Sequence, residues 1–155
     1  MHLDLLLRVV QERVKMPNRF KTRFLSLFRE LFLYHSGSLE FRAKVLAVVI
    51  AANSKHDVCE QEILAEIAKQ TYRSNADRAQ ILVNAVNEYV DKIEDNSSTL
   101  FNSLINDIEH EVKVTKRYKK KIDITQLNRF VNCSDESDDT IYQQRVIAFL
   151  ERVKG

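Results

Sequence analysis

Apolar residues recur at helical spacing along most of the chain, and the densest such stretch lies between residues 39 and 52. Little of that helix would be polar, because its apolar positions are Phe41, Val45, Leu46, Val48, Val49, Ile50 and Ala52. A polar break over residues 53–59 separates it from a second amphipathic segment, with Ile63, Leu64, Ile67 and Ala68 on one face. The stretch 39–72 therefore predicts a helical hairpin whose first arm is buried in the middle of the fold.

Further amphipathic segments flank this hairpin on both sides. The pattern predicts a helix over residues 2–16, ended by Pro17, and another over residues 19–34, followed by a turn at residues 36–38. Beyond the hairpin, helices are expected to begin at Ser74 or Asn75 and at Ser98 or Thr99, with a polar loop over residues 94–98 between them. Two last helices are expected over residues 124–131 and 142–153. The expected architecture is all-α: an N-terminal helix in residues 1–17 and one domain in residues 18–155, with about seven to eight helices in all.

Composition supports a helical protein and says little about partners. The chain has two glycines and one proline, too few for many strands joined by tight turns. The net charge of +2 implies no partner by itself, and the longest apolar run, residues 45–52, is far short of a membrane span. No export signal is evident, and the only cysteines are Cys59 and Cys133. These features favour a reducing, cytoplasmic setting with free thiols and no disulfide framework.

The densest charge cluster is a second polar break, which precedes the last helix. Carboxylates in the two breaks could bind a divalent cation; the candidates are Asp135, Glu136, Asp138 and Asp139, with Asp57 and Glu62 in the first break. The cluster is not an EF-hand, because Thr140 and Val146 occupy the positions of its glycine and its bidentate glutamate. The alternative is structural: acidic residues stabilise the N-terminus of the following helix, with Asp138 as its cap.

Two other constellations have ordinary explanations beside their chemical ones. Asp107, His110 and Glu111 share a helical face that could ligate a metal, but no second copy of the pattern exists and a solvated face is the simpler interpretation. Cys59 follows His56 by three residues, yet nothing marks it as a nucleophile. No residue is predicted to be catalytic, and the chain is predicted not to be an enzyme.

A basic run covers residues 113–121 and contains one aromatic residue, Tyr118. It could contact nucleic-acid phosphates or an anionic surface through Lys116, Arg117, Lys119, Lys120 and Lys121. It could equally be a solvated linker.

Residues 47–68, AVVIAANSKHDVCEQEILAEIA, resemble the TerB-like family, a helical domain named for tellurite-resistance proteins and also found at the N-terminus of DjlA-type DnaJ co-chaperones. In that family an alanine-rich buried helix is followed by Asp-Gly, a β-branched residue and a glutamate. Ala51, Ala52, Val58 and Glu62 match, whereas Lys55 and His56 stand at the aspartate and glycine positions. In the later break, Asp135 and Glu136 occupy those two positions.

The resemblance implies a TerB-like fold over roughly residues 20–153 and a non-enzymatic, protein-binding or stress-response role in the cytoplasm. It also implies that the chain could be the front part of a DnaJ-type co-chaperone. The His-Pro-Asp signature of a J domain is absent here, since the single proline, Pro17, lies between Met16 and Asn18. Two alternatives stay open: a divalent-cation module that uses the acidic loops, and a nucleic-acid or anionic-surface binder that uses residues 113–121.

Overall fold

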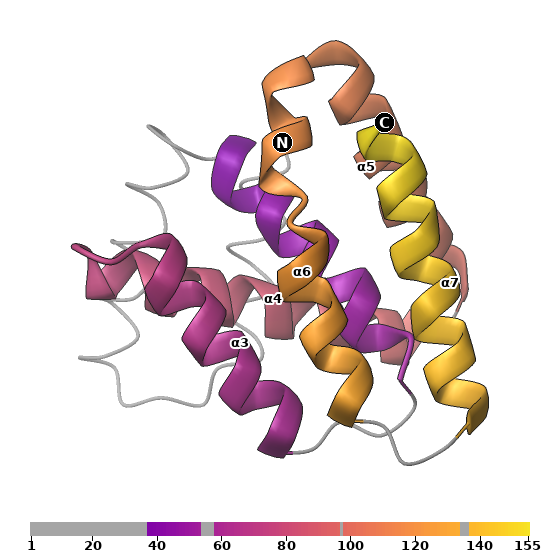
Figure 1. The fold of residues 1–155 in the computed structure, drawn as a ribbon, viewed down its shortest axis with the longest axis horizontal. Coiled ribbons are helices and arrows are strands. Elements are labelled where there is room, and N and C mark those ends of the chain that lie inside the picture. Colours follow the sequence, from indigo (N-terminus) through magenta and orange to yellow (C-terminus); the bar gives the residue numbers. More distant parts are fainter. Residues whose placement is uncertain (1–36, 54–57, 97, 134–136) are drawn as a thin grey trace.

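The computed structural model describes residues 37–53, 58–96, 98–133 and 137–155 (Figure 1). Within these ranges the chain forms six α-helices and two short 3-10 helices, without a strand, which confirms the all-α class. The first helix covers residues 37–51 and is called the central helix below. The others are α3 (Val58–Thr71), α4 (Ala76–Asn96), α5 (Ser98–Val114), η1 (Lys116–Lys121), α6 (Ile124–Asn128), η2 (Arg129–Cys133) and α7 (Ser137–Lys154). The helices predicted over residues 2–16 and 19–34 lie outside the described residues.

The central helix is the buried arm that its apolar pattern predicted. Every side chain from residue 43 to residue 50 is buried, so the helix is enclosed on all sides. Neighbours from four different elements contact it. Tyr118 of η1 stacks on Phe41 with ring centroids 4.8 Å apart, and Gln143 of α7, fully buried, donates a hydrogen bond to the carbonyl oxygen of Val49 (3.1 Å). Side chains of α4 and α5 contact it through the charged cluster described below.

Some predicted helix boundaries differ from the observed ones, and one agrees. The polar loop expected over residues 94–98 is wrong, because α4 continues through Asn96 and α5 begins at Ser98. The single helix expected over residues 124–131 is divided into α6 and η2. The start of α4 agrees with the prediction, since the Asn75 side chain accepts a hydrogen bond from the backbone N–H of Arg78 (3.0 Å).

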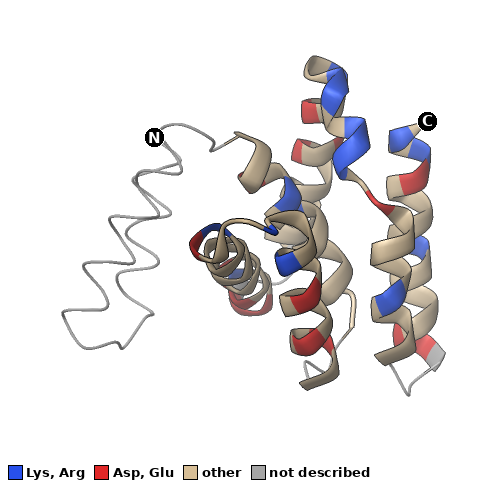
Figure 2. Cartoon of the chain, turned by 60° about the vertical axis from the view of Figure 1, so that its left-hand side comes forward, with Lys and Arg blue, Asp and Glu red and all other residues tan. Residues whose placement is uncertain are grey.

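The basic run is a folded element and not a linker. In a 3-10 helix, residues three apart share a face, so Tyr118 and Lys121 lie on one side of η1. Tyr118 is buried there, whereas Lys116, Lys119 and Lys120 are exposed. Figure 2 shows that Lys and Arg residues follow η1 and the carboxyl end of α7, which lie at the same end of the molecule.

Candidate functional site

The residues predicted to bind a cation are only partly within the described structure. Asp57, Asp135 and Glu136 lie outside it. Asp138 and Asp139 lie within the first turn of α7, where they can interact favourably with the helix dipole. The helix begins at Ser137, so Asp138 is not its cap as predicted. Glu62 is exposed on α3. Among the described residues, no group of three His, Cys, Asp or Glu side chains could hold a metal ion. The cation-binding alternative remains a prediction.

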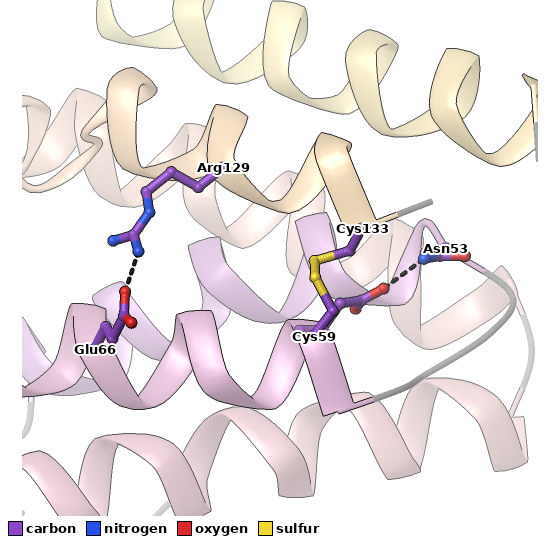
Figure 3. The surroundings of a disulfide bond; sticks show 6 residues. Asn53, Cys59, Glu66, Arg129 and Cys133 are labelled. Atoms are coloured by element: carbon purple, nitrogen blue, oxygen red, sulfur yellow. Dashed lines mark hydrogen bonds and ion pairs between the residues drawn. A yellow bond between two sulfur atoms is a disulfide. The ribbon is translucent and has the colours of Figure 1, made fainter. Parts of the chain in front are cut away.

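Cys59 and Cys133 form a disulfide bond, so the expectation of two free thiols is wrong (Figure 3). The two residues are 74 positions apart, and their Cα atoms are 5.7 Å apart. The bond joins the first turn of α3 to the end of η2 and thereby connects the segments that flank the two polar breaks. A sulfur atom in this bond is not a thiolate, so Cys59 is not a nucleophile in this state. The cytoplasmic prediction loses one of its supports, because disulfides persist mainly in oxidising compartments.

Two polar contacts reinforce the attachment of α3. The Asn53 side chain donates a hydrogen bond to the buried Glu60 carboxylate, which joins the end of the central helix to the start of α3. Farther along α3, Glu66 forms an ion pair with Arg129 of η2 (Figure 3). One face of α3 is therefore held to η2 both by the disulfide and by an ion pair.

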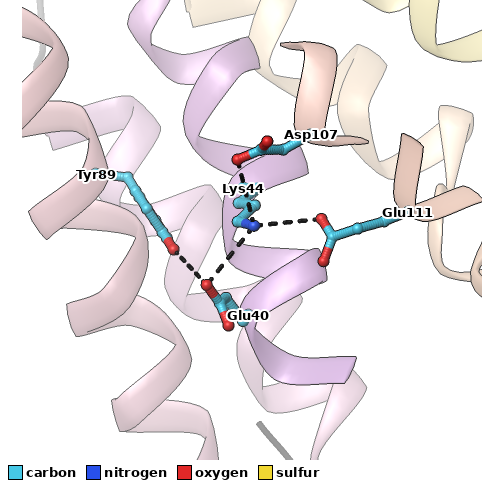
Figure 4. Close-up of polar contacts among 5 residues, drawn as sticks. All are labelled: Glu40, Lys44, Tyr89, Asp107 and Glu111. Carbon is cyan, nitrogen blue, oxygen red and sulfur yellow. Dashed lines mark hydrogen bonds and ion pairs between the residues drawn. The ribbon is translucent and has the colours of Figure 1, made fainter. Parts of the chain in front are cut away.

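A buried lysine, Lys44 of the central helix, lies among three carboxylates (Figure 4). Its ammonium is 3.3 Å from Glu111, 3.6 Å from Glu40 and 3.7 Å from Asp107. Tyr89 of α4 donates a hydrogen bond to Glu40 (3.1 Å). Asp107 and Glu111 belong to the helical face predicted either to ligate a metal or to be solvated. Both are instead ion-pair partners of Lys44.

The electrostatics of this cluster favour the charged lysine. Burial alone would lower the pKa of Lys44, but Glu40, Glu111 and Asp107 together outweigh it, and the pKa lies above its ordinary value. Burial raises the pKa of Glu111, although Lys44 opposes this. Burial and the neighbouring Glu40 also raise the pKa of Tyr89 far above its ordinary value. The cluster therefore joins the central helix to α4 and α5 as a structural unit.

Apolar side chains line an open groove between α5 and α7. Both helices carry a stripe with the same spacing of four, three and four residues: Phe101, Ile105, Ile108 and Val112 on α5, and Tyr142, Val146, Phe149 and Val153 on α7. At one end the rings of Phe101 and Tyr142 are 6.0 Å apart. At the other end the helices leave a groove of about 340 Å³, floored by the apolar side chains of Val112, Phe149 and Val153. The name α5–α7 groove is used for this feature.

Charged side chains form the rim of the α5–α7 groove. Glu109 and Lys113, one turn apart on α5, form an exposed ion pair (3.2 Å), and Arg152 stands on α7. Phe149 and Val153 are only half-buried, so part of each apolar side chain remains accessible. Sequence periodicity identified these residues as inward-facing but could not show that the two helices fail to close over them.

Comparisons with protein-family models, with curated proteins and with solved structures found no match to this chain. In the part of the chain that the structure describes, no helix is long and apolar enough to cross a membrane.

Proposed function

We propose that this chain is a non-enzymatic protein-binding module of the TerB-like type, and that its α5–α7 groove binds an amphipathic helix of a partner protein. The observation that carries the proposal is the groove itself, an open volume of about 340 Å³ over the apolar floor formed by Val112, Phe149 and Val153. An apolar floor between two helices, with charged side chains at its rim, has the composition that a docked amphipathic helix requires.

The size of the groove suggests how a helix would bind. Its volume is near the lower end of the range of about 300–1,000 Å³ that is typical of ligand sites, so it has room for a few side chains and not for a whole helix. A partner helix would therefore lie across α5 and α7 and insert anchors from one face, at spacings of three and four residues. Phe149 would be the main contact, because aromatic side chains contribute most to such interfaces.

Charge on the rim favours an acidic partner. Glu109 and Lys113 compensate each other, whereas Arg152 forms no ion pair with a described residue. The exposed Lys119 of η1 lies beside the carboxyl end of α7. A partner helix with aspartate or glutamate beside its apolar face would complement this rim and associate faster at low salt.

A photo-crosslinking amino acid placed at position 149 tests the proposal in cells that produce the full chain. The matched control carries it at position 144, where Gln144 is exposed elsewhere on the same helix. We expect crosslinks from position 149 but not from 144, to a segment whose sequence is amphipathic and acidic. Equal crosslinking from both positions, or none from position 149, would refute the groove as a binding site.

The stress-response role and the co-chaperone arrangement are further parts of this proposal, and they rest on the TerB-like resemblance alone. In the co-chaperone arrangement, a J domain belongs to a longer product of the same gene. An immunoblot of native extract would then show a band well above the 18.1 kDa of this chain. A band at that mass would remove the co-chaperone arrangement and leave the groove proposal unaffected.

A further inference from the structure

Four cationic side chains from three separate parts of the chain lie near one another, and none of them forms an ion pair within the described structure. They are Arg42 of the central helix, Arg78 of the first turns of α4, and Arg117 and Lys121 of η1. Arg42, Arg117 and Arg78 are all close enough to act electrostatically on the Lys121 ammonium. None of the four forms an ion pair with a described carboxylate. We call them the cation cluster.

The cluster is built around two tyrosines that hold its guanidinium groups. The Arg78 guanidinium lies 4.8 Å from the centre of the Tyr72 ring, and that of Arg117 lies 5.5 Å from the centre of the Tyr118 ring. Burial raises the pKa of the Tyr72 hydroxyl, and the positive charges of Arg42 and Arg78 oppose this rise. The buried hydroxyl oxygen of Tyr72 and the buried Nε atom of Arg78 have no hydrogen-bond partner, which is uncommon and unfavourable for buried polar atoms.

A carboxylate nearby does not neutralise the cluster. Arg42 and Lys121 line a small cleft together with Asp123. Asp123 accepts a hydrogen bond from the backbone N–H of Gln126 (3.1 Å) and caps α6, and no ion pair joins it to Arg42 or Lys121 in the described structure. The cleft has a volume of about 10 Å³, room for about one water-sized group. A ligand would therefore lie at its mouth.

We propose that Arg42, Arg78, Arg117 and Lys121 form a binding site for the phosphoryl group of a phosphate monoester. One dianion would relieve the repulsion among the four cations. Arginine forks match phosphate oxygens in geometry, and lysine adds a point charge. Burial, and then Arg42, Arg117 and Arg78, lower the pKa of Lys121, as expected of a cation held among others without an anion.

A compact dianion fits the geometry better than a nucleic-acid backbone does. Lys121 lies on the side of η1 that faces the protein, close to Arg42 and Arg78, whereas Arg117, Lys116, Lys119 and Lys120 are exposed. Nucleic-acid binding would use these outward lysines at least as much as Lys121, since phosphodiesters are spread along a strand. The site is independent of the α5–α7 groove, and none of its residues lines that groove.

The test measures binding of inorganic phosphate, of phosphoserine and of a single-stranded oligonucleotide to the full chain by calorimetry at constant ionic strength. The variants are Lys121→Gln and Arg42→Gln. The matched controls, Lys119→Gln and Lys120→Gln, remove the same charge from the exposed side of η1. If phosphoserine binds and inorganic phosphate does not, the natural ligand is a phosphate ester. If both bind, free phosphate is also a possible natural ligand.

We expect phosphate or phosphoserine to bind the wild type and both controls, and to bind Lys121→Gln and Arg42→Gln about tenfold or more weakly, because each loses a charge-assisted contact. Without anion, Lys121→Gln should melt at the same temperature as the wild type or higher, because repulsion is removed. Lys121→Arg should retain binding. Phe149→Ala should also retain phosphate binding, because Phe149 lies in the α5–α7 groove and not in the cation cluster. The two proposals can therefore fail independently of each other.

Three outcomes would overturn the site. The first is no binding of phosphate or phosphoserine to the wild type. The second is equal weakening in the Lys119 and Lys120 controls, or binding of the oligonucleotide alone, either of which would indicate diffuse attraction along η1. The third is a lower melting temperature of Lys121→Gln without anion, which would indicate that Lys121 has a structural partner.

Discussion

Removing the disulfide should cost a large share of the stability of this protein. The proposed change is the double substitution Cys59→Ala and Cys133→Ala, which deletes the bond and leaves no free thiol. The bond closes a loop across 74 positions. The chain-entropy relation for a loop of that length gives about 15 cal/mol/K, or about 4.5 kcal/mol at 25 °C, close to the upper end of the roughly 2–5 kcal/mol measured for native disulfides.

Urea unfolding monitored by circular dichroism would measure the loss. With an m-value of about 2 kcal/mol/M, the midpoint of the double variant should lie roughly 2 M below that of the oxidised wild type. Reduction of the wild type should produce a similar shift, whereas the same reductant should leave the double variant unchanged. Identical midpoints for oxidised wild type and double variant, or two reactive thiols in the native protein under non-reducing conditions, would refute the assignment.

Three further predictions concern the Lys44 cluster and the acidic start of α7. Lys44→Met leaves Glu40, Asp107 and Glu111 without their cation and should lower the free energy of unfolding by about 1–3 kcal/mol, because these carboxylates are only partly buried. Chemical denaturation that shows the variant to be as stable as the wild type would contradict this prediction. Folding raises the pKa of Tyr89 above its ordinary value of 10.0 and that of Lys44 above its ordinary value of 10.5. Groups with raised pKa values contribute stability at lower pH and lose it as pH rises through the folded-state value. Wild-type stability should therefore fall above about pH 10, and Tyr89→Phe should fall less steeply in a pH series of melting curves. Asp138→Asn should cost about 0.3–1 kcal/mol equally with calcium or with EDTA, whereas a metal-dependent melting shift lost in this variant would favour the cation-binding alternative.

Periodicity in the sequence predicted the elements that depend on local pattern. The central helix is a clear case, because an unbroken apolar segment with no polar face can only be buried, and the structure buries every residue from 43 to 50. The cap at Asn75 and the apolar stripe of α5 follow from the same rule. The predicted helices before residue 37 lie outside the described residues.

The features that periodicity missed depend on contacts between distant parts of the chain. Lys44 looks like a polar interruption of an apolar helix until Glu111, 67 positions away, is placed beside it. Two cysteines 74 positions apart give no indication of pairing. The cation cluster is similar: Arg117 and Lys121 were visible in the basic run, but Arg42 and Arg78 join them only in three dimensions.

The basic run carries a local signal of its folded state. Its one aromatic residue, Tyr118, and Lys121 have the spacing of three that puts residues on one face of a 3-10 helix. Tyr118 is buried against Phe41, which fixes η1 on the protein. A buried aromatic residue within a charged segment was therefore the signal that the segment is folded.

The central claim is that the α5–α7 groove binds a partner helix, and the affinity of that helix for groove variants tests it most directly. The partner segment crosslinked to position 149 would be synthesised as a peptide and titrated into wild type, Phe149→Ala and the control Gln144→Ala. We predict a loss of about 2 kcal/mol or more, roughly 30-fold in affinity, for Phe149→Ala and none for Gln144→Ala. Equal affinity for all three proteins would contradict the claim.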